Sequence, residues 1–440
     1  MKVKSIAAAT LLVASTAWTP VFAADLGGDC CADLEERVAE LEATTARKGN
    51  RKVSLTVSGW VNEAVTYWDD GYESNVYQLT NMQSQTRFRF TGNAKISADW
   101  SAGYVLELGV AGSRSDGVDA DNDDNGSGVS VRVSAWYLDS KTLGRVSVGQ
   151  QSTATDGLLD SHIANLGHVF GENGAAQVGA FRLGHDGNRI NSFMGGANAA
   201  GTAGTDSGQI GEGNRMNVVR YDTPSIAGFK LSASWGEDDQ WDAALRYAGE
   251  FGGFKLAMNV GYQQIRDGNG STPVSERNCV VGKDGVPGDN PDIDCEQAGI
   301  WGGLMHVPTG LFAEGGYGVR WDNNVAPGYD DSSTQWFVVA GIEQKFFPLG
   351  KTTIWGEYQR WDVGMTQSGW NAPGSEDPYD SAKLRAWGFG INQQIDAAAM
   401  DIYLFYRNYD GSNRYDDGED VTNRNYKSFQ QITAGGRIQF

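Results

Sequence analysis

The chain ends on the sequence FQQITAGGRIQF, residues 429–440, whose side chains alternate between the two faces of an extended strand. One face carries only apolar or small residues: Ile432, Ala434, Gly436, Ile438 and Phe440. The other face carries mostly polar residues: Gln431, Thr433, Gly435, Arg437 and Gln439. This alternation is typical of a strand with lipid on one side and water on the other. A terminal Phe440 on the lipid side would close a barrel without a loose tail, although an ordinary terminal strand shows the same period.

The same period of two recurs along the chain, for example in segments 229–235, 254–263 and 311–320. About sixteen such segments start near Val53, Gln85, Gly103, Gly128, Gly144, Asn214, Gly228, Gln240, Gly252, Ala298, Gly310, Thr334, Lys351, Ser381, Ala397 and Lys427. The connections alternate between short ones and long ones, with 69–84 among the long. Membrane barrels have this asymmetry between periplasmic turns and outer loops. We therefore predict an all-β fold: a transmembrane antiparallel β-barrel of about 16 strands over residues 52–440.

Composition agrees with a membrane barrel. The 440 residues include 14 Trp, 17 Tyr, 17 Phe and 59 Gly but only 10 Pro. Trp and Tyr are enriched where a barrel meets the two lipid–water interfaces. The mean hydropathy of −0.41 does not contradict this, because half of each strand faces water. The formal charge of −20 argues against a nucleic-acid partner.

Residues 1–23 have the features of a secretory signal peptide. Lys2 and Lys4 precede an apolar run over 6–13, and a small-residue cleavage site ends at Ala23. No later stretch approaches the ~18 apolar residues of a transmembrane helix. The protein is therefore expected to be exported and to cross the Gram-negative outer membrane with strands.

Residues 24–51 form a short segment of their own before the barrel. Leu34, Val38 and Leu41 have helical spacing among acidic residues, which fits a short periplasmic coiled coil that helps to trimerise the protein or a solvated helical linker. The adjacent Cys30 and Cys31 would stay free or cross-link subunits. Farther along the chain, Cys279 and Cys295 share one polar segment and are candidates for a disulfide.

The connection 152–213 is too long for an ordinary loop, and loops of that length are normally functional. It contains apolar residues that a solvated loop would not need: Leu158, Leu159, Ile163, Leu166, Val169, Phe170, Phe181 and Phe193. Its acidic residues include Asp156, Asp160, Glu172 and Asp186. We infer that this segment folds into the lumen and narrows the pore.

A basic wall would face these carboxylates. Arg87 and Arg89 alternate with phenylalanines, and Arg132 and Arg145 lie beside valines, so all four side chains could point inward. Opposite charges across a constriction create a transverse field that selects solutes by size, charge and polarity. The alternative is that these arginines only solvate the lumen or pair with nearby carboxylates.

Three motifs resemble the Gram-negative porin family. They are NVVRYDTP (217–224) followed by AGF (227–229), RFRFTG (87–92), and GRVSVGQ (144–150). Cys30-Cys31 and the acidic segment after them are similar to porins of the alphaproteobacterial, rhizobial type. The resemblance implies a sixteen-stranded homotrimer, passive diffusion of small hydrophilic solutes, an inward third outer loop and pore-wall roles for Arg87 and Arg132. Phe440 resembles the signal that the barrel assembly machinery reads.

We therefore interpret the chain as an outer-membrane porin, a passive diffusion channel for small hydrophilic solutes and ions. The alternatives are a substrate-specific outer-membrane channel and a structural or adhesive barrel. We expect no enzyme activity, cofactor or metal, because the four histidines show no catalytic or metal-binding spacing. The aspartates at 116–124 do not fit a calcium-binding EF-hand and indicate a solvated outer loop. Outer-membrane lipid and lipopolysaccharide are the expected surroundings.

Overall fold

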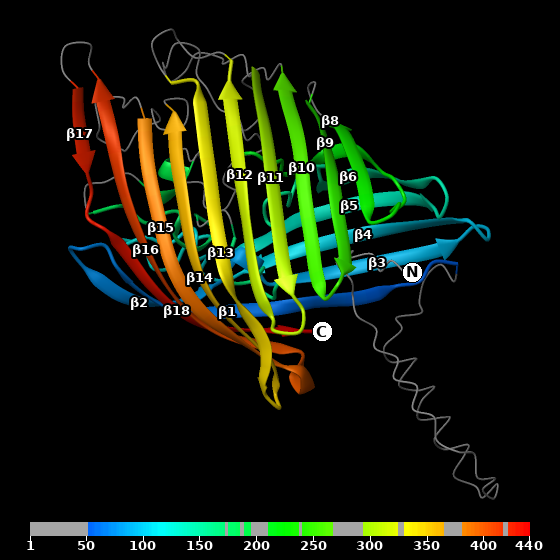
Figure 1. The fold of residues 1–440 in the computed structure, drawn as a ribbon, viewed down its shortest axis with the longest axis horizontal. Coiled ribbons are helices and arrows are strands. Elements are labelled where there is room, and N and C mark those ends of the chain that lie inside the picture. The colour runs from blue at the N-terminus through cyan, green and yellow to red at the C-terminus, as the bar shows by residue number, and fades with distance from the viewer. Residues whose placement is uncertain are drawn as a thin grey trace, which may run out of the picture.

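The computed structural model describes residues 52–171, 175–184, 189–194, 210–236, 240–266, 294–323, 330–364, 381–416 and 421–440. Within these residues, strands β1 to β18 form one antiparallel sheet that closes on itself, because β1 pairs with both β18 and the β2/β3 region (Figure 1). The strands are β1 Thr56–Asp69, β2 Ser74–Thr80, β3 Arg87–Lys95, β4 Trp100–Ala111, β5 Gly128–Ser140, β6 Gly144–Ser152, β7 Arg215–Asp222, β8 Phe229–Gly236, β9 Gln240–Phe251, β10 Phe254–Arg266, β11 Asp294–His306, β12 Leu311–Asp322, β13 Ser332–Phe347, β14 Gly350–Gly364, β15 Ser381–Ile395, β16 Met400–Asp416, β17 Val421–Asn425 and β18 Phe429–Gln439. The helices described are all of five residues or fewer: η1 Met82–Ser84, α2 Ala175–Val178, η2 Ile190–Met194 and η5 Asp396–Ala398.

Two of the spans across the barrel are interrupted. β2 and β3 both pair with β1, with η1 between them, and β17 and β18 both pair with β16. The eighteen strand segments therefore make sixteen spans, and the predicted antiparallel barrel of about 16 strands is confirmed. The expectation that 69–84 is a long loop was wrong, because β2 turns back on β1 after the short turn at Gly71, whose φ is +84°.

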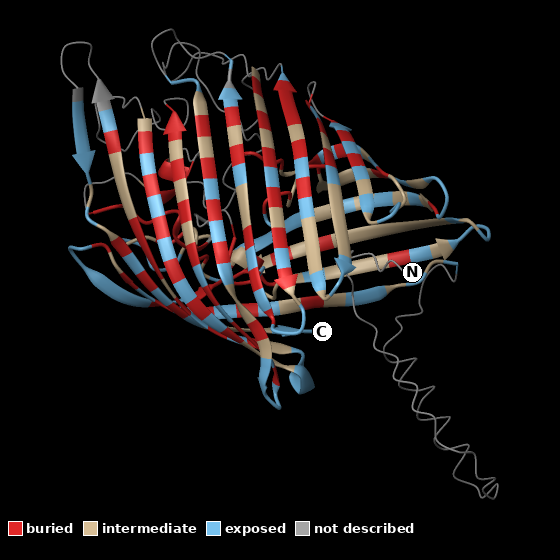
Figure 2. Ribbon diagram, in the orientation of Figure 1, coloured by how far each residue is buried: buried red, intermediate tan, exposed pale blue. Residues whose placement is uncertain are grey.

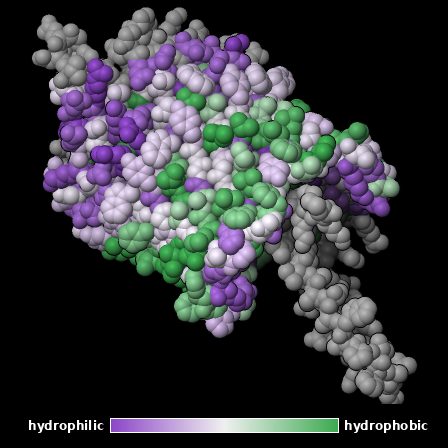
Figure 3. All heavy atoms as spheres, viewed as in Figure 1, coloured by the Kyte–Doolittle hydropathy of each residue, from purple (hydrophilic) through white to green (hydrophobic). Residues whose placement is uncertain are grey.

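The outer surface carries the apolar face of each strand. Val65 on β1, Trp136 on β5, Val338 on β13 and Phe389 on β15 are each at least half exposed in the isolated chain. Figure 3 shows hydrophobic side chains gathered in a band across this face, with hydrophilic ones toward the end that carries the long loops. None of the described helices is long and apolar enough to cross a membrane. The apolar band is therefore the surface that contacts lipid.

The C-terminal residue seals the junction between the last and first strands. Phe440 and Gly59 exchange two backbone hydrogen bonds of 3.0 and 3.1 Å. The Phe440 ring is 55% exposed on the lipid side and lies against the Phe88 ring at a centroid distance of 5.9 Å. A Cβ at position 59 would lie 2.1 Å from the Arg87 carbonyl oxygen, so glycine is required for this close approach.

Short turns gather at one end of the barrel and long connections at the other. The chain turns tightly between β9 and β10, β11 and β12, and β13 and β14, and the C-terminus lies at this end (Figure 1). By the usual asymmetry of such barrels, this is the periplasmic end. Residues 1–51, with the expected signal peptide, coiled coil, Cys30 and Cys31, lie outside the described residues.

Candidate functional site

The described residues of the segment between β6 and β7 lie inside the barrel and are held there mainly by apolar packing. In its first part, Leu159, Leu166, Val169 and Phe170 are fully buried. They pack against lumen-facing aromatic and aliphatic side chains of strands β11 to β16, which we call the far wall. The wall residues are Trp301, Met305, Phe312, Phe337, Val339, Trp355, Tyr403 and Phe405, from strands β11 to β16. Figure 2 shows the resulting alternation of buried and exposed residues along these strands.

A second apolar cluster lies around the later part of the segment. Phe181, Leu183, Ile190 and Phe193 are at most 1% exposed and pack against β1, β2, β14 to β16 and β18. Their wall partners include Trp68, Tyr77, Trp361, Leu384, Tyr409 and Phe429. Burying one large apolar side chain is worth about 1.5–3 kcal/mol, so the two clusters together hold the segment firmly against this side of the barrel.

Carboxylates of the wall bind backbone N–H groups of the segment. Asp242 on β9 accepts from the backbone N of Thr155 at 2.7 Å and from its Oγ1 at 2.6 Å. Glu314 on β12 accepts from the backbone N of Ile163, and Glu343 on β13 from that of Asn165, both at 2.8 Å. Hydrogen bonds to charged acceptors are among the stronger ones in proteins, so these acids fix the path of residues 155–165.

A buried ion pair supports the same segment from β14 and β16. Arg407 and Glu357 are paired, and both side chains are at most 2% exposed. Arg407 also donates to Gln177 Oε1 at 2.5 Å and to the carbonyl oxygen of Val169 at 3.4 Å. The guanidinium thereby links two turns of the segment to the wall, and its charge is compensated by Glu357.

Two histidines of the segment have opposite environments. His162 contacts Glu314 at 2.8 Å and Asp160 at 3.1 Å. Burial favours its neutral form, but the Glu314 charge and these hydrogen bonds outweigh burial and raise the pKa of His162 to about 10. His168 is fully buried beside Asn392 and the Tyr403 ring, and burial together with the Arg437 charge lowers its pKa to about 4. At neutral pH the first histidine is therefore charged and the second is neutral.

The opposite wall, from β3 to β9, keeps exposed side chains in the lumen, and they are mainly basic. Three arginines of this wall surround the buried Glu107 of β4. Arg87 Nη1 and Arg132 Nε lie 3.2 and 2.9 Å from Glu107 Oε1, and Arg89 Nε donates to Oε2 at 2.6 Å. Because three positive charges surround one negative charge, the cluster has a net charge of about two positive units. Arg89 is the most open of the three, with 42% of its side chain exposed.

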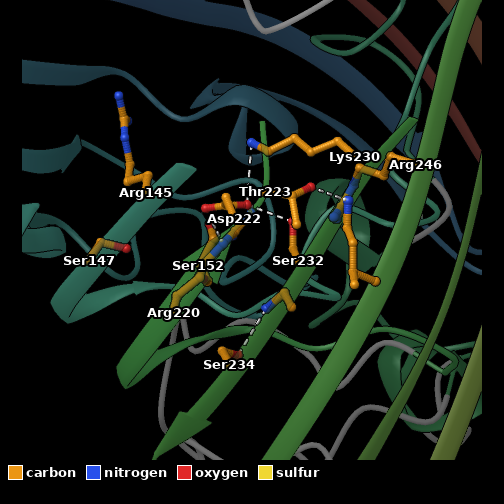
Figure 4. Close-up of polar contacts among 12 residues, drawn as sticks. Arg145, Ser147, Ser152, Arg220, Asp222, Thr223, Lys230, Ser232, Ser234 and Arg246 are labelled. Atoms are coloured by element: carbon orange, nitrogen blue, oxygen red, sulfur yellow. Dashed lines mark hydrogen bonds and ion pairs between the residues drawn. The ribbon is translucent and has the colours of Figure 1, made fainter. Parts of the chain in front are cut away.

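A second basic group lies on β7, β8 and β9, and Figure 4 shows its side chains directed toward one another. Arg220 binds Asp222 through two hydrogen bonds of 2.9 and 3.1 Å, and Lys230 Nζ lies 3.3 Å from the same carboxylate. Arg220 also donates to the carbonyl oxygens of residues 152 and 153, and Arg246 to that of Asp156. This group therefore positions the start of the inserted segment and adds positive charge beside it.

The basic residues predicted from sequence all lie on lumen-facing positions, but in two places. Arg87, Arg89 and Arg132 come together around Glu107. Arg145 is separate: it follows the short turn between β5 and β6, pairs with Asp139 at 2.9 Å and stacks on the Tyr137 ring at 4.1 Å. Arg145 is therefore placed at the periplasmic end of the wall.

The predicted acidic residues have different surroundings. Asp156 lies 3.9 Å from Arg215 at the start of β7. Asp160 contacts His162 and not the basic wall. Glu172, Asp186 and Cys279 lie outside the described residues, whereas Cys295 is buried on β11 and disulfide-bonded.

Sequence reasoning missed Glu107, Arg220, Lys230 and Arg246. Their signal was the same alternation that identified Arg87, because each lies between outward apolar residues of a strand, as Arg220 does between Val219 and Tyr221. Among the described residues, no group of His, Cys, Asp and Glu is arranged to hold a metal ion. In the acidic outer loop, Asp116 pairs instead with Arg114 at 2.8 Å.

Comparison with known proteins gives one family and one fold. The model of the Gram-negative porin family matches residues 8–435. Among solved structures, the anion-selective porin from Comamonas acidovorans has a TM-score of 0.53 at 14% identity, covering 88% of this chain and 100% of that one. The trimer form of OmpT, an outer membrane protein of Vibrio cholerae, has a TM-score of 0.51 at 13% identity (88% and 99% covered). OmpF from Salmonella typhi, in complex with daunomycin, has a TM-score of 0.52 at 13% identity (88% and 98% covered). No curated protein sequence matches the chain significantly.

Proposed function

The chain belongs to the Gram-negative porin family and is a multi-pass β-barrel channel of the outer membrane, and from this premise we propose the route that solutes take through it. Small hydrophilic solutes and ions diffuse passively between the inserted segment 152–213 and the wall made by β3 to β9. The Arg87, Arg89 and Arg132 cluster forms the basic side of the narrowest part. Asp156 is the facing carboxylate best supported by its contacts, because it lies near Arg215.

One observation carries this proposal: the two sides of the lumen differ in exposure. On β11 to β16, lumen-facing side chains such as Trp301, Phe337 and Trp355 are at most 2% exposed, since the segment covers them. On the other side, Arg89 and Lys230 keep 42% and 45% of their side chains exposed. Water and solutes therefore have access to the basic side. With three arginines around one glutamate, we propose a preference for anions over cations of similar size.

The test is ion selectivity in a planar bilayer. The variant R87Q/R89Q/R132Q removes three lumen charges, and the variant R360Q/K383Q/R385Q removes three from the outer surface of β14 and β15 as a matched control. One unit charge acting on an ion at about 4 Å in water contributes roughly 1 kcal/mol, or about fivefold in population. We expect the chloride-to-potassium permeability ratio to fall at least fivefold in the lumen variant and little in the control.

Two results would overturn the proposal. A folded protein without conductance would remove the channel function altogether. Conductance with unchanged selectivity in the lumen variant would place the arginine cluster away from the solute path.

A substrate-specific channel for anionic solutes is the second candidate. It is favoured by the second basic group of Arg220, Lys230 and Arg246, which extends the positive wall beyond the arginine cluster. The two candidate functions differ in whether the current through the channel saturates as the solute concentration rises. A specific channel would show half-maximal block of chloride current by one organic anion at a defined concentration, whereas a general porin would show a current that stays proportional to salt.

We also propose a homotrimeric assembly of the alphaproteobacterial, rhizobial type. The expected coiled coil in 24–51 and the adjacent Cys30 and Cys31 support this, as does the trimer form recorded for the similarly folded OmpT. We propose that residues 1–23 are removed as a signal peptide, that Phe440 directs the barrel assembly machinery and that the barrel has no catalytic activity. Deleting 24–51 should weaken the trimer on analytical ultracentrifugation without changing single-channel conductance.

A further inference from the structure

A pocket of about 350 Å³ opens near the loop end of β14, β15 and β16, and three basic residues line it: Arg360, Lys383 and Arg385. These residues lie on the outer surface of the barrel. Arg360 shares its face of β14 with the exposed Ile354, and Lys383 and Arg385 share theirs with the exposed Phe389 of β15. The pocket is thus separate from the lumen and from the solute path proposed above.

The recess exists because the strand ladder is interrupted beside it. β17 pairs with β16 as far as Ser412 and Asn425, and β18 resumes the pairing at Tyr409 and Phe429. Between these two strands the regular pairing stops, although Tyr426 still donates its backbone N–H to the Gly411 carbonyl oxygen at 3.1 Å. The pocket is lined there by Tyr426 and by Ser412 of β16. A ligand in it would therefore meet backbone and hydroxyl groups as well as the basic side chains.

The three basic side chains at the pocket outnumber the carboxylates beside them, Asp362 and Asp410, by one. Arg360 and Arg385 are direct cross-strand neighbours, and like charges in that arrangement are destabilising. Asp362 compensates Arg360 through hydrogen bonds of 2.7 and 3.1 Å and lies 4.0 Å from Lys383. Arg385 lies directly across from Asp410 of β16, a carboxylate that also lines the pocket and that accepts hydrogen bonds from Asn408 and Ser428. One positive charge of the group is left without a matching carboxylate, and a bound anion would offset it.

The depth of the pocket matches the lipid head-group region. The Trp387 and Tyr406 rings lie 5.4 Å apart on the same face and belong to the aromatic residues at the edge of the apolar band. Arg385 is two residues beyond Trp387 toward the loop end, which is about 7 Å along a strand. Aromatic belts mark the lipid–water interface, so the basic cluster lies just outside it. Figure 3 shows hydrophilic side chains gathered over this part of the face.

We propose that this pocket binds a phosphate group of a phosphorylated glycolipid of the outer leaflet, the lipopolysaccharide class. The inference rests on the outer-membrane porin assignment and names the site of its lipid partner. Arg360 and Arg385 suit bidentate contact with phosphate oxygens, and Lys383 adds a point charge. The acyl chains of the same lipid would lie on the apolar band below the aromatic residues.

The test is native mass spectrometry of the refolded full-length porin, titrated with a purified phosphorylated lipopolysaccharide. Three proteins are compared: wild type, R360Q/K383Q/R385Q, and the control K95Q/K141Q/K345Q, which removes three exposed lysines near the short-turn end. A basic group near an anionic lipid surface contributes about fivefold in affinity, so we expect roughly a hundredfold loss in the pocket variant. The control should bind as the wild type does. The single variant R385K keeps the charge but not the bidentate contact, so its affinity should lie between those of the wild type and the pocket variant.

Dephosphorylated lipopolysaccharide and inorganic phosphate are the other two probes. Equal binding of the dephosphorylated lipid, or an equal loss in the control variant, would overturn the proposal. Saturation by inorganic phosphate together with no lipid binding would assign the site to free phosphate and also overturn it. A pocket variant that keeps lipid but dissociates into monomers would assign the cluster to subunit contact. Conductance is recorded for each protein, so loss of the channel itself is distinguished from loss of the lipid.

Discussion

Replacing Phe170 by alanine tests whether the inserted segment is held by apolar packing on a barrel that is stable without it. Phe170 is fully buried and packs on Phe337 of β13 at a centroid distance of 5.5 Å and on His162 at 5.8 Å. Phe-to-Ala changes at such positions cost about 3–5 kcal/mol. The backbone of the barrel wall keeps all its ladder hydrogen bonds, since Phe170 belongs to none of the strands. The substitution should therefore destabilise the inserted segment and leave the stability of the barrel unchanged.

Hydrogen exchange measures this directly. A loss of about 3–5 kcal/mol corresponds to roughly 10²- to 5 × 10³-fold faster exchange of the protected amides between 155 and 170, if they exchange through local opening of the segment. Single-channel recordings should show larger and noisier currents, because the segment covers the far wall less well. The control is F389A, which removes the same side chain from the lipid face, where Phe389 is 57% exposed.

Either of two exchange results would contradict this explanation. Uniformly faster exchange across β11 to β16 would mean that the segment is part of one cooperative unit with the barrel. Unchanged exchange in the segment would mean that the wall carboxylates hold it without the apolar cluster.

Three other predictions follow from charged groups. E107Q leaves three arginines around a neutral group, so the preference of the channel for chloride should rise. The free energy of unfolding, measured in guanidinium, should fall by about 3 kcal/mol. Unchanged stability would show that the arginines do not need the Glu107 charge. His162 is charged in the fold, and its pKa of about 10 lies above the ordinary 6.5, so its stabilising effect is complete below about pH 6.5 and disappears as the pH rises through 10. Current noise in a bilayer should therefore increase at alkaline pH in the wild type and be independent of alkaline pH in H162Q. His168 has the opposite sign: its lowered pKa of about 4 favours the neutral form, so stability is present above about pH 6.5 and is lost as the pH falls toward 4. Current noise in the wild type should therefore also increase as the pH falls toward 4, and H168N should not show this increase. The same increase at acid pH in H168N would contradict the assignment.

The strands could be predicted from sequence because one physical rule governs nearly all of them. Lipid and water on opposite sides of a strand impose a period of two, and Phe229 to Trp235 shows it without any knowledge of the neighbours. The rule failed at 74–80, because β2 has only seven residues and is followed by an inward turn at Met82–Ser84. Tyr77 and Leu79 of this strand are buried under the inserted segment, so their environment is set by residues more than a hundred positions away.

The site was predicted less completely for a related reason. Periodicity tells which side of a strand Arg87 and Arg132 face, and both are on the lumen side. It does not tell which lumen residues the inserted segment will cover. Glu107 is essential to the arginine cluster, yet in the sequence it is one more acidic residue on a strand. The distinction between an exposed pore residue and a buried anchor depends on the path of the segment 152–213, which has no period of its own.

The same distinction explains why the acidity of the chain is a poor guide to the charge of its passage. The formal charge is −20, but several lumen carboxylates are used to hold the segment. Glu314 and Glu343 bind its backbone N–H groups, Glu357 compensates the buried Arg407, and all three side chains are at most 6% exposed. These acids lie beneath the segment, on the side from which solutes are excluded. The charges left in contact with water on the other side are mainly those of arginine and lysine. A porin of strongly acidic composition can therefore present a basic wall to the solutes that cross it, and charge reversal at Arg89 should change selectivity more than charge reversal at Glu343.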